Sequence, residues 1–261
     1  MLLAADVGNT EIVLGVFDAD RLEHTWRLST RPERTSDELA LALSGFLAQR
    51  GVDFDADLHG LVVASVVPDV TAAFREMATR AFPFAPLLVG PGTKTGVPIL
   101  TDNPREVGAD RVVNTLAAFT KFGGPAIVVD FGTATNFDVV SARGEFLGGV
   151  IAPGMQASAA SLFSRTARLT RVELAAPGHA IGTSSVEAIQ SGLVFGTAGA
   201  VDAIVTRIRE ELGDEAGDPT VIATGGLAPV VLPHCRTVEH HEPWLTLEGL
   251  RLVYEKNLGD G

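Results

Sequence analysis

Residues 1–17, MLLAADVGNTEIVLGVF, and residues 125–140, PAIVVDFGTATNFDVV, show the same pattern twice. In each stretch an apolar run ends in an Asp, a turn containing Gly follows, and a second apolar run begins. Short apolar runs bounded by turn residues are typical of buried strands, so each stretch predicts two strands joined by an Asp-x-Gly turn. Because further strand and helix patterns follow each stretch, the sequence predicts an α/β protein with a coarse internal repeat.

The rest of the chain alternates between strand and helix patterns. Apolar spacing predicts further strands over residues 24–30, 60–68, 86–90 and 220–224, and three strands in succession within 125–153. It predicts helices over 36–51, 70–82, 109–122, 155–163, 184–212 and 246–257. Ser36 is the predicted N-cap of the first helix and Gly51 its stop. The halves divide within residues 100–115, which predicts domains of 1–108 and 109–261.

Composition excludes several classes of protein. The 261 residues carry a net charge of −12, which repels nucleic acids and acidic membranes. The single cysteine, Cys235, rules out an internal disulfide and argues against a Cys-based zinc site. The N-terminus lacks the basic region and long apolar stretch of a signal peptide, and no uninterrupted apolar run reaches the ~18 residues of a membrane helix. We therefore expect a cytoplasmic protein.

The two Asp-x-Gly turns are candidates for phosphate binding. Gly8 and Gly132 have no Cβ, which lets backbone N–H groups approach a phosphate closely. The carboxylates of Asp6 and Asp130 can hold a cation directly or through water, and Mg²⁺ prefers such oxygen ligands. A purely structural turn closed by glycine and capped by Asp is the alternative for either turn alone. Two turns in matching contexts favour a pair that holds a triphosphate and its metal from both sides of a cleft.

Gly225 and Gly226 follow the strand predicted at residues 220–224. A glycine pair lets a flat group such as adenine lie against the backbone. A structural strand-to-helix turn is an equally good interpretation.

Asp110 lies where the helix over residues 109–122 is expected to start. A carboxylate in the first turn is favoured by the helix dipole, which gives it a structural explanation. The functional interpretation is that Asp110 accepts the proton of a substrate hydroxyl that attacks a γ-phosphate. Arg111 beside it can pair with Glu106 or hold an anionic substrate group. Spacing alone leaves these alternatives open.

Three other features predict little chemistry. His240 and His241 lack a third metal ligand and indicate a solvated loop. Ser158 and Ser161 lack the G-x-S-x-G context of a hydrolase nucleophile. Cys235 is expected to be an inert, buried thiol.

Several blocks together resemble the type III pantothenate kinases of the acetate-and-sugar-kinase/Hsp70/actin superfamily. These are DVGNT, NPREVGADRVVN, VVDFGTATNFDVV, GEFLGGVIAPGM and ATGG, in order over nearly the whole chain. The resemblance implies two RNase-H-like (actin-like ATPase) domains related by duplication, with a cleft between them, and a homodimer. It also implies ATP-dependent phosphorylation of pantothenate to 4′-phosphopantothenate, the first step of coenzyme A biosynthesis.

The resemblance also implies roles for individual residues. Asp110 matches the catalytic base, Asp130 a ligand of a monovalent cation (K⁺ or NH₄⁺), and Asp6 a site for Mg²⁺. The residues that match ATP-binding positions are Asp6, Val7, Gly8, Asn9, Thr10, Glu11, Ile12, Val13, Gly132, Thr133, Gly225 and Gly226. Those that match the pantothenate site are Gly108, Ala109, Asp110, Arg111, Thr101 and Ser185.

The sequence departs from the family pattern on the acceptor side. Thr101 stands where many members have Tyr, and Thr183-Ser184-Ser185 stand where members usually have Lys-Asn-Thr; Asn136 replaces a common Thr. A homologous kinase acting on a different hydroxylated acceptor is therefore an alternative. A non-catalytic actin-like nucleotide-binding protein is a second, which Asp110 argues against. An RNase-H-like nuclease is a third, which the net charge disfavours.

Overall fold

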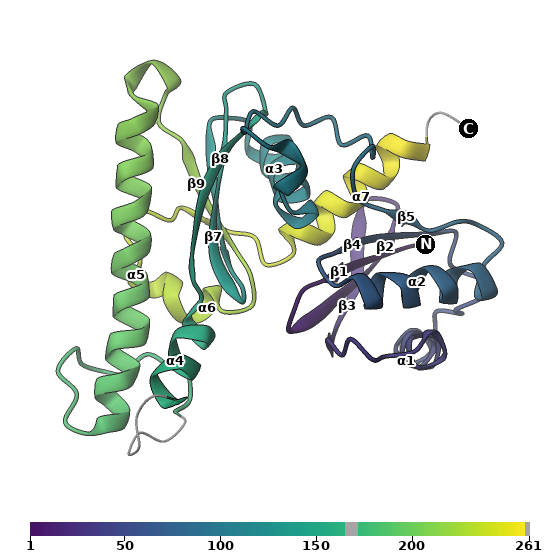
Figure 1. Ribbon diagram of the computed structural model, residues 1–261, viewed down its shortest axis with the longest axis horizontal. Helices are drawn as coiled ribbons and strands as arrows, with labels where there is room; N and C mark the ends of the chain where they lie inside the picture. The colour runs from purple at the N-terminus through teal and green to yellow at the C-terminus, as the bar shows by residue number, and fades with distance from the viewer. Residues whose placement is uncertain (165–171, 259–261) are drawn as a thin grey trace. The chain divides into compact units, whose positions relative to one another are not determined.

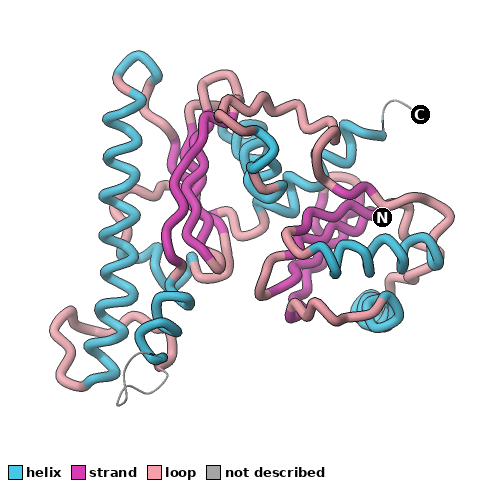
Figure 2. Tube along the Cα trace, viewed as in Figure 1, coloured by secondary structure: helices cyan, strands magenta, loops and turns pink. Residues whose placement is uncertain are grey.

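The structure is a computed structural model that describes residues 1–164 and 172–258 (Figures 1 and 2). By its internal contacts the chain forms two compact units. The first comprises residues 1–96, 103–117 and 246–261, and the second comprises 97–102 and 118–245. This division is discontinuous along the chain, whereas the predicted domains of 1–108 and 109–261 are continuous. Helix α3 (Ala109–Phe122) contributes its first part to the first unit and its remainder to the second.

The first unit contains a five-stranded sheet in the order β3-β2-β1-β4-β5. Strands β1, β2 and β3 pair antiparallel in succession, whereas β4 and β5 add parallel to β1. The strands are β1 (Leu2–Val7), β2 (Glu11–Asp18), β3 (Arg21–Ser29), β4 (Gly60–Ser65) and β5 (Leu87–Leu88). The central strands β1 and β4 are almost wholly buried, as their apolar sequences predict.

The helices of the first unit are α1 (Ser36–Ala48), α2 (Pro68–Ala81), the first part of α3, a 3₁₀ turn η1 (Pro104–Glu106) and α7 (Leu245–Leu258), of which residues 246–258 belong to this unit. Helix α7 packs tightly on the sheet, since a Cβ on Gly15 would lie 2.7 Å from Leu247 Cδ1. Its Tyr254 hydroxyl donates to the carbonyl oxygen of His59 at 3.3 Å. The C-terminal segment therefore completes the core of the N-terminal sheet, which is why the division by contacts is discontinuous.

The start of α1 corrects the predicted N-cap. Thr35, not Ser36, caps the helix, because the Glu38 backbone N–H donates to Thr35 Oγ1 at 3.2 Å while the Thr35 N–H donates to Glu38 Oε2 at 2.9 Å. This is a capping box, in which Thr and the Glu three residues later satisfy each other. Ser36 is buried inside the helix. Both hydroxyl residues fit the cap preference, and the spacing to Glu38 decides between them.

The second unit repeats the topology of the first. Its sheet has the order β10-β9-β6-β7-β8, with β6, β7 and β8 antiparallel in succession and β9 and β10 parallel to β6. The strands are β6 (Ala126–Phe131), β7 (Ala134–Val140), β8 (Phe146–Pro153), β9 (Thr220–Thr224) and β10 (His240–His241). Each unit thus has three antiparallel strands followed by two parallel ones on the other side of the first. The predicted internal duplication and α/β fold class are confirmed.

The remaining elements of the second unit are α4 (Met155–Ser164), α5 (Ser185–Leu212), α6 (Ala228–Val231), and the 3₁₀ turns η2 (Asp214–Ala216) and η3 (Leu232–His234). Figure 1 shows α5 running alongside this sheet. Its buried residues belong to the core cluster of the sheet: Val194, Ala198, Val201, Val205 and Ile208.

Within the described part of the chain, α5 is the one helix that is long and apolar enough to cross a membrane by length and composition alone. Its buried stripe packs in the core of the second unit, and Asp202 lies in its middle. There Asp202 Oδ1 accepts hydrogen bonds from the N–H groups of Arg236 at 2.8 Å and Thr237 at 3.0 Å. One face of α5 therefore packs on the second unit, whereas only 22% of its most apolar window is buried.

Candidate active site

The first Asp-x-Gly turn joins β1 to β2. Asp6, the penultimate residue of β1, lies opposite Val13 of β2 and Ala64 of β4. The Gly8 N–H donates to the carbonyl oxygen of Glu11 at 3.0 Å and closes the turn. Thr30, just after β3, supports the turn by donating its hydroxyl to the Gly8 carbonyl oxygen at 2.7 Å. The predicted turn is therefore present, with Asp6 at the carboxyl end of the central strand.

The residues around this turn differ in exposure. Asn9, Thr10 and Glu11 are exposed, whereas Val7 and Ile12 are buried on either side. Glu11 forms an ion pair with Arg27, with Glu11 Oε2 3.1 Å from Arg27 Nη1. The exposed tip therefore carries the side chains of Asn9 and Thr10 together with the Glu11 carboxylate, which is paired with Arg27.

The second turn occupies the equivalent place between β6 and β7. Asp130, the penultimate residue of β6, lies opposite Asn136 of β7 and Thr224 of β9. The Gly132 N–H donates to the Ala134 carbonyl oxygen at 3.0 Å, so this turn is shorter than the first. Asp6 and Asp130 thus hold the same position in the two repeats.

Gly225 lies directly beside Asp130. Its φ of +93° is in the region that favours glycine, and a Cβ there would lie 2.5 Å from Asp130 Oδ1 and 2.6 Å from the backbone N and O of Phe131. Gly226 follows and is exposed. The structure therefore brings the predicted adenosine segment and the predicted cation ligand together.

Asp110 lies in the first turn of α3, as predicted. The helix begins with the N–H groups of Arg111 and Val112 donating to the Gly108 carbonyl oxygen at 3.1 and 3.3 Å. A Cβ on Gly108 would overlap Asp110 Oδ1, so glycine leaves room for this carboxylate. Glu106, the predicted partner of Arg111, accepts a hydrogen bond from Asn103 Nδ2 at 2.6 Å. Gly108, Ala109, Asp110 and Arg111 thus form one compact helix start in the first unit.

Thr101 and Ser185, the residues that depart from the family pattern, both belong to the second unit. The segment around Thr101 runs along β8, where the Leu100 N–H donates to the Phe146 carbonyl oxygen at 2.9 Å. The Thr101 Oγ1 atom is buried and has no hydrogen-bond partner among the described residues. Ser185 is exposed at the first position of α5.

Thr183 and Ser184 have a structural role at the start of α5. Ser184 is the N-cap and accepts the Glu187 N–H at 3.2 Å, while Glu187 Oε2 accepts the Thr183 N–H at 2.8 Å and its hydroxyl at 2.9 Å. Hydrogen bonds from Thr183 lower the pKa of the Glu187 carboxyl. Thr183 and Ser184 therefore stabilise the start of α5 by capping it.

His240 and His241 are exposed as predicted, but the expected loop is wrong. They form the short strand β10, which pairs parallel with β9 at Ile222 and Ala223. The His240 ring also packs on Phe122, with ring centroids 4.7 Å apart. A two-residue strand at a sheet edge is decided by pairing with a distant segment, which a local pattern does not reveal. Among the described residues no cluster of three metal-ligating side chains is found.

Cys235 is half-buried, and burial together with the nearby Asp202 carboxylate raises the pKa of its thiol to about 12. Its Sγ donates to the Val231 carbonyl oxygen at 3.7 Å. A thiol with such a pKa is protonated near neutral pH and is a poor nucleophile, which agrees with the expected inert cysteine.

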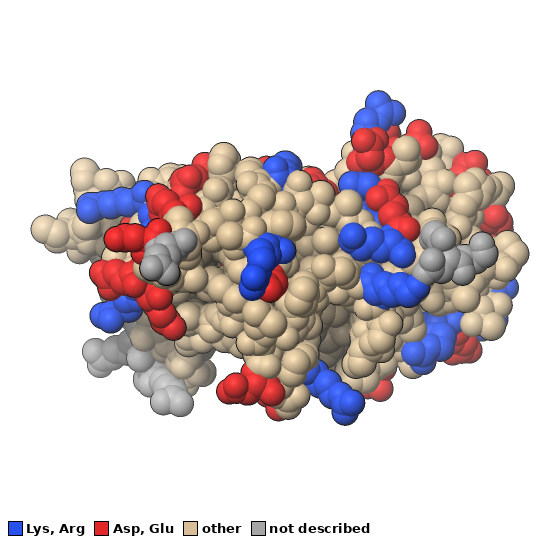
Figure 3. All heavy atoms as spheres, turned by 90° about the horizontal axis from the view of Figure 1, so that it is seen from above, with Lys and Arg blue, Asp and Glu red and all other residues tan. Residues whose placement is uncertain are grey.

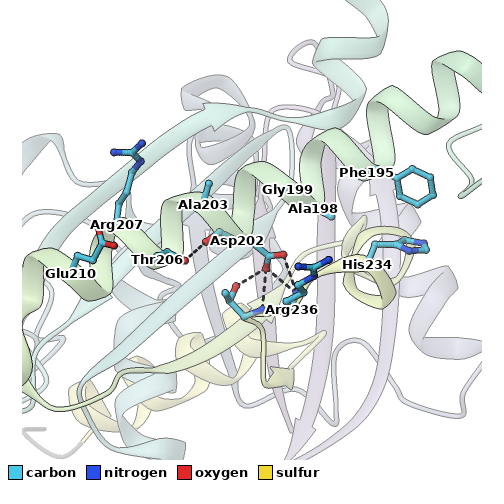
Figure 4. Close-up of a pocket in the computed structure, with 11 residues that line it drawn as sticks. Phe195, Ala198, Gly199, Asp202, Ala203, Thr206, Arg207, Glu210, His234 and Arg236 are labelled. Atoms are coloured by element: carbon cyan, nitrogen blue, oxygen red, sulfur yellow. Dashed lines mark hydrogen bonds between the residues drawn. The ribbon is translucent and has the colours of Figure 1, made fainter. Parts of the chain in front are cut away.

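A groove of about 750 Å³ lies along α5 (Figure 4). Its walls come from one side of α5 and from the segment around His234 and Arg236, as the sticks in Figure 4 show. None of the predicted site residues lines it. The groove is a separate feature of the second unit.

The fold and the two turns define a class of protein. The repeated sheet, with an Asp-x-Gly turn after the central strand of each copy, is the two-domain, actin-like fold. Component A of the (R)-2-hydroxyglutaryl-CoA dehydratase of Acidaminococcus fermentans shares this fold, with a TM-score of 0.58, 14% identity and 98% of each chain covered. A conserved putative Baf family transcriptional activator from Campylobacter jejuni gives a TM-score of 0.58 at 18% identity, again over 98% of each chain.

Sequence comparison identifies the family. The profile described as "Type III pantothenate kinase" matches residues 2–207. Curated relatives with that name include proteins from Acidothermus cellulolyticus, 58% identical over 99% of both chains, and Streptomyces avermitilis, 54% identical over 99% of both chains. The chain belongs to the type III pantothenate kinase family.

Proposed function

We propose that the protein transfers the γ-phosphoryl group of ATP to the hydroxyl of pantothenate, forming 4′-phosphopantothenate in the first step of coenzyme A biosynthesis. The observation that carries this proposal is the Asp-x-Gly turn at the same position of both repeated sheets, in a chain of this family. The exposed donors at the turn tips suit the oxygen atoms of a phosphate.

The proposed mechanism gives each unit a part of the reaction. In the first unit, the turn after β1 would bind phosphate through its N–H groups, and Asp6 would hold Mg²⁺ directly or through water. In the second unit, Asp130 would hold K⁺ or NH₄⁺, Thr133 would contact the phosphates, and Gly225 and Gly226 would receive the adenosine. These cations supply neutralisation of the phosphate charge when bound. The carboxyl ends of β1 and β6 offer carboxylate oxygens of the kind such ions prefer.

Asp110 is the proposed general base. Its carboxylate lies in the first turn of α3. A carboxylate there can accept the proton of the attacking hydroxyl, while Gly108, Ala109 and Arg111 orient the acceptor. A place at the helix start and a catalytic role are therefore compatible.

A homologous kinase with a different hydroxylated acceptor is the second candidate. The observation in its favour is that Thr101 and Ser185 differ from the family pattern, and that Thr183 and Ser184 are engaged in capping α5. The resemblance places Thr101 and Ser185 in the site of the acceptor and not in that of ATP. Differences at these residues would therefore change which acceptor is phosphorylated and would leave the use of ATP intact.

A coupled ATPase-type assay distinguishes the two candidates. With purified protein and Mg·ATP, we expect turnover with pantothenate that requires Mg²⁺ and is higher in K⁺ or NH₄⁺ than in Na⁺. Pantothenate should be compared with other small hydroxylated acids and amides under the same conditions. If pantothenate gives no turnover and another acceptor is phosphorylated, the protein is a kinase with a different substrate.

We further propose that the protein is a cytoplasmic homodimer that associates through α5. The exposed face of α5 carries a row of small residues at helical spacing: Ala188, Gly192, Gly196, Gly199 and Ala203. A Cβ built on any of the three glycines meets no atom within 4 Å. Small residues allow two helices to approach closely, which suits contact with the same face of a second copy.

Replacing Gly196 by lysine is expected to convert the dimer to a monomer, because a long charged side chain would separate the two helices. Size-exclusion chromatography with light scattering would show a mass near 27.3 kDa for the variant and about twice that for the parent protein. Gly196→Ala is the matched control and should remain dimeric. A monomeric parent protein, or a dimeric Gly196→Lys variant, contradicts this assignment.

A further inference from the structure

Two glycines hold the second Asp-x-Gly turn from opposite sides. Gly225 follows β9, which pairs with one edge of β6, and Gly154 follows β8, which pairs with β7. The register Ala134↔Pro153 places Gly154 next to Thr133, and the register Asp130↔Thr224 places Gly225 next to Phe131. The turn from Asp130 to Thr133 is therefore enclosed by backbone on both sides.

The approach at Gly154 is as close as the approach at Gly225. A Cβ on Gly154 would overlap the Thr133 carbonyl oxygen and would lie 2.7 Å from the Thr133 carbonyl carbon and 2.8 Å from the Gly132 oxygen. These are backbone atoms, which cannot rotate away as a side chain does. Gly154 is buried and also starts α4, since its carbonyl oxygen accepts the Ser158 N–H at 2.9 Å. Its position is thus set by β8 on one side and by a helix on the other.

The first unit provides an internal comparison. The registers Asp6↔Ala64 and Glu11↔Ser29 show that Ser65 and Thr30 occupy the places that Gly225 and Gly154 hold in the second unit. Ser65 and Thr30 both have side chains, and Thr30 supports the first turn by a hydrogen bond to Gly8. The repeated fold therefore accepts side chains at these two places. The need for glycine arises from the second turn itself.

We infer that Gly154 is a positioning residue of the active site, which together with Gly225 sets the distance between the Asp130 carboxylate and the Thr133 backbone and hydroxyl. The inference rests on the proposed function, in which Asp130 binds the monovalent cation and Thr133 the phosphates. A methyl group at residue 154 would push Thr133 away from β8 and change the geometry of both ligands. Misplacement of reacting groups by about 1 Å can reduce catalysis by about 10²-fold.

Gly154→Ala tests the inference, with Gly124→Ala as the matched control. A Cβ on Gly124 would overlap the Ser141 carbonyl oxygen and lie 3.0 Å from its carbonyl carbon, so the crowding is similar. Gly124 precedes β6, whereas Asp130 is near the other end of that strand. Thermal unfolding is expected to show reduced stability for both variants. A difference in activity between them is then not explained by the loss of stability.

The two variants should differ in their response to cations. For Gly154→Ala we expect at least a tenfold higher half-saturating K⁺ concentration and about a tenfold or greater loss of kcat, against changes within about twofold for Gly124→Ala. The second readout is Mg·ATP binding by calorimetry in K⁺ and in Na⁺, which needs no acceptor. It therefore tests the inference even if pantothenate proves not to be the substrate.

Two outcomes would overturn the inference: unchanged K⁺ and ATP parameters in Gly154→Ala, or equal changes in Gly124→Ala. If Gly154→Ala does not yield folded protein, Gly225→Ala crowds the same turn from the β9 side and is judged by its K⁺ dependence alone, because Gly225 is itself proposed to contact the adenosine. Loss of K⁺ dependence in Gly225→Ala would then support the enclosed-turn arrangement, and wild-type cation behaviour would refute it.

Discussion

Asp110→Asn is expected to lower kcat by about 10²-fold or more while the Kd for Mg·ATP changes by less than about twofold. Asparagine preserves the shape of the side chain but cannot accept the proton of the attacking hydroxyl. A 10²-fold loss corresponds to about 2.7 kcal/mol of transition-state stabilisation. Steady-state kinetics with pantothenate and calorimetric titration with Mg·ATP measure the two quantities.

Asp69→Asn is the matched control for this prediction. Asp69 lies in the first turn of α2, in the same unit, and is exposed. Removing either carboxylate takes a negative charge from a helix N-terminus, which costs about 0.3–1 kcal/mol of stability. If Asp110 served only the helix, both variants would lose similar stability and keep similar activity. A large loss of kcat in Asp110→Asn but not in Asp69→Asn would show that Asp110 has a catalytic role beyond stabilising the helix start. Near-normal turnover of Asp110→Asn would exclude Asp110 as the general base.

Much of the fold is predictable because the strands and helices of the repeat have recognisable local sequence patterns. The strand patterns before and after Asp6 and Asp130 correspond to β1, β2, β6 and β7, which are six to eight residues long. Their burial makes the pattern strong, since both faces of these strands are covered. The helices α2, α3, α5 and α7 were likewise found at their observed places, within a residue or two at each end.

What the sequence did not reveal depends on contacts between distant segments. Strand β10 exists only because His240 and His241 pair with β9. The assignment of α7 to the first unit follows from packing of Leu247 and Tyr254 against β2 and the start of β4. No local pattern marks Gly154, because glycine is required there by the close approach of the Thr133 backbone, twenty-one residues earlier in the chain. A signal was nevertheless present, since the block GEFLGGVIAPGM that contains Gly154 contributed to the family resemblance.

On the face shown in Figure 3, acidic and basic side chains are interspersed among uncharged residues. Together with the net charge of −12, this distribution offers a polyanion little attraction. In the proposed mechanism, phosphate binding depends instead on local groups at the two Asp-x-Gly turns.

Asp130→Asn is expected to abolish the difference between K⁺ and Na⁺ and to lower kcat by about tenfold or more at saturating ATP. Asparagine keeps the hydrogen-bonding shape of the side chain but loses the charge that holds the cation, so the phosphate charge in the transition state is less well neutralised. The measurement is kcat as a function of K⁺, NH₄⁺ and Na⁺ concentration at constant ionic strength. Retained K⁺ activation in this variant would place the cation elsewhere.

The duplication supplies the control for this last prediction. Asp6 occupies the position of Asp130 in the first repeat, so Asp6→Asn removes the same charge from the same place on the other sheet. If the two turns have the proposed division of labour, Asp6→Asn raises the Mg²⁺ requirement and leaves the ratio of K⁺ to Na⁺ activity near that of the parent protein. If both variants lose K⁺ activation equally, the assignment of separate cations to Asp6 and Asp130 is wrong.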